Sequence, residues 1–312
     1  MNPESPERPE GLVVIGESLV DILVSPDGER SERPGGPCLN VAVAASRLGI
    51  ATTLITQLGD DSRGELVRRH AAGSSVTLQE HATASGRTST ATARIGETGA
   101  ATYDFDLDWS PSRIDLGDPR VLHVGSLGTV LSPGSGAVAE AVEQAGQRPG
   151  TVVTYDPNVR PSFIDDVEQA VADVRSWAGR ADLVKLSDED AETLAPDLDP
   201  GDLAASLVGG RTRLVVLTRG GEGATAYAEG LVVSAPAPQA EVVDTVGAGD
   251  TFSAGLIAAL LAEDRLDDDA WHREETVVRR LLTSAAAAAA VTVSRPGADP
   301  PRIDELAPWP AG

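Results

Sequence analysis

Two glycines, a small residue and a carboxylate stand side by side in the run Gly247-Ala248-Gly249-Asp250, just before an apolar stretch at 253–261 that is typical of a buried helix. The first turn of a helix presents backbone N–H groups without helical partners and the positive end of the helix dipole, and both attract anions. A carboxylate there can accept a proton from a nucleophile that attacks the bound anion. Because glycines also form tight turns and Asp also caps helices, the run by itself indicates either such a site or a plain helix start.

Two polar segments near the N-terminus could bind a ligand. Asp21 follows the apolar run at 12–15, and its carboxylate can accept hydrogen bonds from two neighbouring hydroxyls. Gly35 and Gly36 permit close approach of a ligand to the backbone, and Asn40 offers both a donor and an acceptor. Taken singly, an Asp such as Asp21 is more often a turn residue, and the segment from Gly35 to Asn40 is equally compatible with an ordinary turn at the start of a helix.

Three later segments also follow apolar runs. Arg160 could recognise an anionic or polyhydroxyl ligand through its guanidinium. The acidic residues of 185–190 could bind Mg²⁺ through water, or merely favour the start of the next helix. The glycine-rich segment 218–223 could cradle a nucleotide phosphate or turn a hairpin.

The elements that must position these residues alternate along the chain. Apolar runs predict strands at 12–15, 53–55, 121–124, 151–154, 183–186 and 214–217, and helical spacing predicts helices at 39–48, 62–72, 135–145, 167–178 and 202–207. This alternation predicts a mostly parallel sheet with helices on both faces. Ligands of such folds bind beyond the carboxyl ends of the strands, where the polar segments lie.

Two regions break this pattern. Residues 88–107 form a β-prone hairpin of small and polar residues, which could be a lid, a dimer edge or an ordinary surface hairpin. Residues 1–10 are polar, contain three prolines and predict a disordered tail.

Composition excludes several classes of protein. The 312 residues carry a net charge of −23, which argues against nucleic-acid and anionic-membrane partners. The single cysteine, Cys38, excludes an intramolecular disulfide and a multi-cysteine metal site, and makes a cytoplasmic location the default. The single lysine, Lys185, is far in sequence from any glycine loop, and G-x-x-x-x-G-K-S/T is absent, so the chain has no P-loop. The first strand ends without G-x-G-x-x-G, which argues against a Rossmann oxidoreductase.

Taken in order, these motifs resemble the ribokinase-like (PfkB) family of carbohydrate kinases. The motifs that carry the resemblance are Gly35-Gly36-x-x-x-Asn40, Gly59-Asp60-Asp61-x-x-Gly64, Thr218-x-Gly220-x-x-Gly223 and Asp244-Thr245-x-Gly247-Ala248-Gly249-Asp250. The resemblance runs from about residue 11 to about residue 307. It implies a three-layer, Rossmann-like α/β kinase domain over 11–312, with a small β lid built from about 17–37 and 86–108.

The resemblance also implies roles for the residues at these motifs. Asp250 would be the general base for a primary hydroxyl of the sugar, and the amides of Gly247, Ala248 and Gly249 would bind the γ-phosphoryl group of ATP. The implied sugar-binding residues are Asp21, Gly35, Gly36, Asn40 and Arg160, and the implied ATP-binding residues are Ser187, Thr218, Gly220, Gly223 and Gly249. Asp190 would act at Mg²⁺, although it stands where the family has Glu. Asp244 and the backbone of Val246 match positions that bind a monovalent cation such as K⁺ in some members.

The substrate stays open at this point. The segments around Gly35 and Arg160 are most similar to the fructokinase branch, so fructose is the first expectation. The 2-keto-3-deoxygluconate kinases share much of that pattern, and there Arg160 could meet a carboxylate. Ribose or a nucleoside comes third, since aromatic residues make up only 3% of the chain and give a base little to stack on. A non-catalytic sugar-binding regulator is the alternative from another class, and a homodimer through the lid is expected from the resemblance.

Overall fold

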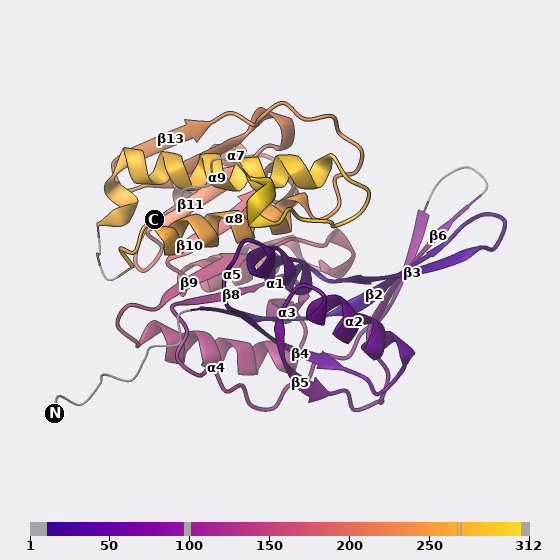
Figure 1. The fold of residues 1–312 in the computed structure, drawn as a ribbon. Helices are drawn as coiled ribbons and strands as arrows, with labels where there is room; N and C mark the ends of the chain where they lie inside the picture. The colour runs from indigo at the N-terminus through magenta and orange to yellow at the C-terminus, as the bar shows by residue number, and fades with distance from the viewer. Residues whose placement is uncertain (1–10, 97–100, 267, 269, 307–312) are drawn as a thin grey trace.

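The computed structural model in Figure 1 describes residues 11–306, apart from 97–100, 267 and 269. The predicted tail at 1–10 and the last six residues of the predicted kinase domain lie outside the described residues. So do residues 97–100 of the predicted hairpin at 88–107.

A nine-stranded sheet forms the body, in the order β13-β12-β11-β10-β9-β8-β1-β4-β5. Its strands are β1 (Leu12–Ile15), β4 (Thr52–Leu58), β5 (Thr77–Ala82), β8 (Val121–Gly125), β9 (Val152–Asp156), β10 (Leu183–Ser187), β11 (Leu214–Thr218), β12 (Ala224–Ala228) and β13 (Leu231–Ala235). All neighbours from β11 to β5 pair in parallel, whereas β12 and β13 are antiparallel at one edge. The predicted mostly parallel sheet is confirmed, and its parallel strands point their carboxyl ends to one edge.

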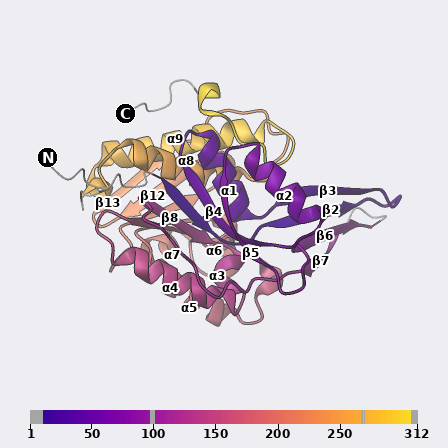
Figure 2. The ribbon, with the colours of Figure 1, turned by 60° about the horizontal axis from the view of Figure 1, so that its bottom comes forward.

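Helices cover both faces of this sheet (Figures 1 and 2). One face packs against α1 (Pro37–Arg47), α2 (Ser62–Ala72), α8 (Ala248–Ala262) and α9 (Glu275–Val293), and the other against α4 (Gly134–Gly146), α5 (Val167–Ala178), α6 (Asp188–Leu194) and α7 (Pro200–Ser206). In β1, Leu12 and Val14 face the first group while Val13 and Ile15 face the second. Burial on both faces explains why these strands are continuous apolar runs.

The short elements connect this framework. They are α3 (Leu127–Val130), η1 (Pro161–Phe163), η2 (Gly220–Glu222), η3 (Trp271–Arg273) and η4 (Ile303–Glu305), where η marks a 3₁₀ turn.

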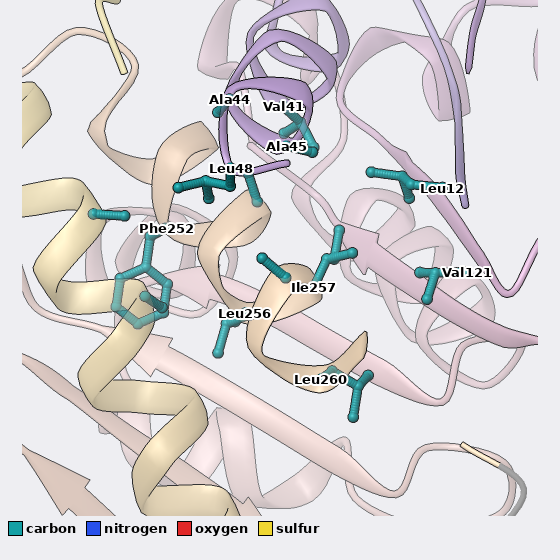
Figure 3. Packing of buried hydrophobic residues seen from close by; sticks show 14 of the residues in the cluster. Leu12, Val41, Ala44, Ala45, Leu48, Val121, Phe252, Leu256, Ile257 and Leu260 are labelled. Atoms are coloured by element: carbon teal, nitrogen blue, oxygen red, sulfur yellow. The ribbon is translucent and has the colours of Figure 1, made fainter. Parts of the chain in front are cut away.

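Helix α8 lies in the middle of its layer, between α1 and α9. Figure 3 shows Leu256, Ile257 and Leu260 of α8 in the same cluster as Val41 of α1 and Leu12 of β1. Residues 250–260 of α8 are all buried, so the helix is enclosed by protein on every side. This packing fixes the position of its first turn, which carries the Gly247–Asp250 motif.

Helix α9 is long and apolar enough to cross a membrane by length and composition. However, Val278, Leu281, Leu282 and Ala285 are buried in the cluster that α9 shares with α8. Its apolar face is therefore part of the protein core.

A second sheet has four strands. It projects from the body, as Figures 1 and 2 show. Its order is β3 (Arg30–Gly35), β2 (Leu19–Val24), β6 (Thr90–Ile95) and β7 (Ala101–Asp106). These strands fall within the two segments expected to form a lid, 17–37 and 86–108. Service as a lid stays a prediction.

Candidate active site

The first turn of α8 has the geometry that its glycines suggest. Gly247 caps the helix with φ +76°, a left-handed conformation that side chains rarely adopt. A Cβ at this position would also lie 2.6 Å from the Cβ of Ala298. Both constraints require glycine, and they place Asp250 in the first helical turn.

The amides of this turn are only partly available to a ligand. Among the described residues, the N–H groups of Gly247 and Gly249 have no acceptor, whereas the N–H of Ala248 donates to the carbonyl of Thr245 (3.2 Å). The first helical bond runs from the Thr251 N–H to the Gly247 carbonyl (2.9 Å). Two of the three amides predicted to bind an anion are therefore free, and Ala248 could contribute only by sharing its bond.

Asp250 and Asn40 meet although 210 positions separate them. The side-chain amide of Asn40, on α1, donates to Oδ2 of Asp250 (2.8 Å). Asp250 is 8% exposed, and burial raises its pKa to about 6. The hydrogen bond from Asn40 opposes that rise, as do the positive charges of Lys185 and Arg160. This pKa leaves the carboxyl ionised at neutral pH yet close enough to titration to accept a proton, as a general base requires.

A buried ion pair lies beneath the same turn. Nζ of Lys185, on β10, is 3.0 Å from Oδ2 of Asp156, at the end of β9, and Ser253 of α8 donates to the same oxygen (3.0 Å). The Lys185 ammonium is 3.1 Å from where a Cβ of Gly249 would stand. The sequence places Lys185 far from any glycine loop, but the sheet brings it to one.

The predicted sugar-binding residues gather at the base of the second sheet. Asp21 on β2 is the register partner of Arg33 on β3, and any side chain at Gly35 would overlap the Asp21 carboxylate. Asp21 stays exposed, but the protein atoms around it partly desolvate its carboxylate and raise its pKa, and the Arg160 charge opposes this rise, as it does at Asp250. Arg160 is therefore near both carboxylates, and it forms no ion pair within the part of the chain that the structure describes.

The predicted ATP-binding residues lie farther along the carboxyl edge. Ser187 and Thr218 are register partners at the ends of β10 and β11. Gly220 and Gly223 close the turn after β11, in which the N–H of Arg219 donates to the carbonyl of Gly223 (2.8 Å). The structure thus brings these residues together in neighbouring loops.

The predicted metal-binding carboxylates already accept backbone hydrogen bonds. Asp190 accepts from the N–H of Val159 (2.7 Å) and that of Ser187 (2.8 Å), while Ser187 Oγ accepts from the N–H of Asp190 (3.0 Å). Asp244 accepts from the N–H groups of Val246 (3.0 Å) and Gly297 (2.8 Å), and these bonds lower its pKa.

These bonds leave each carboxylate oxygen a further lone pair. Within the described ranges, no three His, Cys, Asp or Glu residues group around a possible metal position. The arrangement fits a cation that takes most of its ligands from phosphate and water, as Mg²⁺ often does. The predicted Mg²⁺ and K⁺ sites stay predictions.

Comparison with known proteins decides the family. Residues 10–305 match the sequence model of the pfkB family carbohydrate kinases. The chain belongs to the PfkB carbohydrate kinase family. It is therefore a sugar kinase, as expected from the motifs.

Relatives of this PfkB kinase include fructokinases. It is 36% identical over 269 residues to the fructokinase of Rhizobium leguminosarum bv. trifolii, covering 82% of this chain and 81% of that protein. It is 33% identical to the fructokinase of Klebsiella pneumoniae, covering 80% and 84%. The crystal structure of fructokinase with bound ATP from Xylella fastidiosa matches with a TM-score of 0.80 and 26% identity, over 93% of this chain and 94% of that one. The three-layer fold predicted from the sequence is thereby confirmed.

Sequence reasoning missed two features near the site of this PfkB kinase. It assigned no role to Lys185, Asp156 or Ser253, although a single lysine inside the apolar run at 183–186 was a signal. It also missed the edge-to-face contact between Phe105 of β7 and Phe163 of η1, whose centroids are 5.1 Å apart. That contact joins the second sheet to the loop that carries Arg160, and no pattern in the sequence indicated it.

Proposed function

We propose that this kinase transfers the γ-phosphoryl group of ATP to the primary hydroxyl of fructose, with Asp250 as the general base. The observation that carries the proposal is the buried, Asn40-bonded carboxylate of Asp250 in a helix turn with free amides. The fructokinase relatives favour fructose, and the ATP-bound Xylella structure favours ATP as the donor.

The step balances with the groups present. The hydroxyl of the sugar gives its proton to Asp250, and its oxygen forms a bond to the γ-phosphorus. The bond from that phosphorus to the bridging oxygen breaks, and its electron pair leaves with ADP. Because negative charge spreads over the transferring group, the free amides of Gly247 and Gly249 stabilise the transition state at the positive end of α8.

The remaining residues position the two substrates. Around the sugar we place Asp21, Gly35, Gly36, Asn40 and Arg160, and around the nucleotide Ser187, Thr218, Gly220, Gly223 and Gly249. Mg²⁺ bound with the nucleotide would neutralise phosphate charge, and Asp190 is the carboxylate that we assign to it through water. Asp244 and the carbonyl of Val246 are assigned to a monovalent cation, because their loop is braced against Gly297.

A 2-keto-3-deoxygluconate kinase is the second candidate. Arg160 has no ion-pair partner in the described part of the chain, and it is exposed. A guanidinium in that state is suited to a substrate carboxylate.

An assay of ADP release with fructose, 2-keto-3-deoxygluconate, ribose and adenosine tests the proposal. We expect the highest kcat/KM with fructose. The highest value with 2-keto-3-deoxygluconate would favour the second candidate, and in that case Arg160→Gln should reduce kcat/KM selectively for the acid. Binding of fructose without ATP turnover would instead indicate a non-catalytic regulator.

A further inference from the structure

The ion pair between Lys185 and Asp156 has no part in the mechanism above, yet it lies against the catalytic turn. The two residues come from neighbouring strands of the sheet, and Ser253 fixes the shared Oδ2 oxygen from the first turns of α8. Lys185 is 5% exposed, and Asp156 is 4% exposed. Two charges this deeply buried cost desolvation energy, which their attraction offsets only in part.

The position of the ammonium is the informative detail. Its Nζ is 3.1 Å from the Cβ position of Gly249, whose amide is free to bind an anion. The N-terminus of a helix carries a partial positive charge, so a cation beside it destabilises the folded protein unless an anion binds there as well. The position of the Lys185 ammonium is therefore better explained by anion binding than by stability. Lys185 is also the only lysine, while the other 24 of the 25 basic residues are arginines. A compact ammonium fits below Gly249 where a planar guanidinium needs more room.

We propose that Lys185 is an electrostatic positioning residue of this kinase: its ammonium, balanced by Asp156, adds positive charge beneath Gly249 and keeps Asp250 ionised. The proposal rests on the function proposed above and assigns a role to a residue outside the family motifs quoted for this chain. On this proposal, Lys185 and Asp156 are buried together because the pair assists phosphoryl transfer, not because it stabilises the fold.

The charges that face Asp250 from each neighbouring element are known. Lys185 on β10 and Arg160 after β9 favour the ionised carboxylate, Asp156 on β9 disfavours it, and Asn40 on α1 donates a hydrogen bond to it. Cys38 on α1 is also within reach of the Asp250 charge. Around Lys185 itself lie Asp156, Asp190, Asp250 and, on β8, the buried His123. Burial lowers the pKa of Lys185, but the three carboxylates more than offset this effect, so Lys185 is charged.

The pH dependence of kcat separates an electrostatic role from a structural one. Lys185→Met removes the charge that favours ionised Asp250, so the acid limb of the profile should move up by roughly one pH unit, the low end of shifts caused by a nearby charge. Asp156→Asn removes the charge that disfavours it, so the same limb should move down. We also expect Lys185→Met to lower kcat about 10- to 100-fold, with a smaller change in the KM for fructose. Opposite shifts are not expected from a general loss of packing.

The double variant Lys185→Met/Asp156→Asn leaves no unpaired buried charge, so it tests the proposal even if the single variants do not fold. We expect it to unfold near the wild-type temperature, with an acid limb close to that of wild type and kcat still at least about tenfold lower. The role of Lys185 would be overturned if the double variant recovered full kcat. It would also be overturned if the single variants folded and kept the acid limb of the wild-type pH profile. An inactive wild type with every sugar would instead overturn the proposed function, so the two failures are distinguishable.

Discussion

The two sheets of this kinase differ in how far their polar side chains are buried and held by partners. At the carboxyl edge of the nine-stranded sheet, Asp156 and Asp250 are buried and each has a fixed partner. In the four-stranded sheet, β3 exposes most of its side chains, and Tyr103 on β7 is 66% exposed. The body thus fixes charges in place, while the second sheet offers surface with few constraints. We infer that the body carries the chemistry and the second sheet controls access to it.

Among substitutions that test this difference between the two sheets, we expect the largest effect on activity from one at Asp250. Asp250→Asn should lower kcat by roughly 10²- to 10⁴-fold, because the amide cannot accept the proton of the hydroxyl. ADP release under saturating ATP and fructose measures this. Glu192→Gln is the matched control, since it makes the same change on an exposed residue of α6 and should leave kcat unaltered. Near wild-type turnover by Asp250→Asn would rule out Asp250 as the base.

Although Asp250→Asn should lower kcat, it should raise the stability of the folded protein at high pH. Burial raises the pKa of Asp250 from 3.8 to about 6, so the folded protein keeps this proton to a higher pH than the unfolded chain does. The stabilisation is therefore complete below about pH 4 and is lost as the pH rises through about 6. Asp250→Asn avoids the free-energy cost of ionising the buried carboxyl, on the order of 3 kcal/mol for a pKa raised from 3.8 to about 6. Thermal unfolding should show the variant more stable than wild type at about pH 8 and similar to it at about pH 4; a variant less stable at the higher pH would contradict this assignment.

Asn40→Ala tests whether the hydrogen bond from Asn40 to Asp250 contributes to activity. Loss of a hydrogen bond to a charged group should reduce kcat/KM for the sugar by roughly 10- to 100-fold. Because that bond lowers the pKa of Asp250, the acid limb of the kcat profile should also move to higher pH. The KM for ATP should change little. An unaltered acid limb would mean that Asn40 contacts only the sugar.

Phe105→Ala tests the contact between the second sheet and the body. Removing the edge-to-face pair with Phe163 should raise the KM for fructose severalfold, consistent with about 0.5–1.5 kcal/mol for such pairs, and leave kcat within about twofold. Phe163→Ala should do the same, and the double variant should be no worse than either single one. A strong loss of kcat would show that the second sheet takes part in the chemistry.

Tyr103→Ser should have the smallest effect on a single chain. This residue is exposed, so the free energy of unfolding should change by less than about 0.5 kcal/mol. If the second sheet joins two copies, as the family resemblance led us to expect, the mass from light scattering should fall from dimer to monomer in this variant. A wild type that is monomeric at every concentration would contradict the expected dimer.

Much of the body could be predicted from the sequence because parallel strands buried on both faces are continuous apolar runs. The run at 12–15 is β1, and the run at 183–186 is β10 without its last residue. The strands β12 and β13 escaped prediction, because their small, alternating residues lie at a sheet edge with one face less buried. Helix α8 begins at Ala248, several residues before the apolar stretch that indicated it, because its first turn is defined by the left-handed Gly247 and not by hydrophobicity.

The sequence by itself determined the family and the position of the motif that we propose to be catalytic, because short motifs such as Gly247–Asp250 and their order can be read directly along the chain. It also supplied Asn40 and Asp21 as candidates, but for the sugar alone. Only the tertiary structure decided that Asn40 bonds to Asp250 and that Lys185 and Asp156 form a buried pair beneath Gly249. The physical reason is that burial and the distances between charges set the ionisation of a carboxylate. Burial and these distances depend on which strands and helices become neighbours in the fold, which cannot be read from the spacing of residues along the chain.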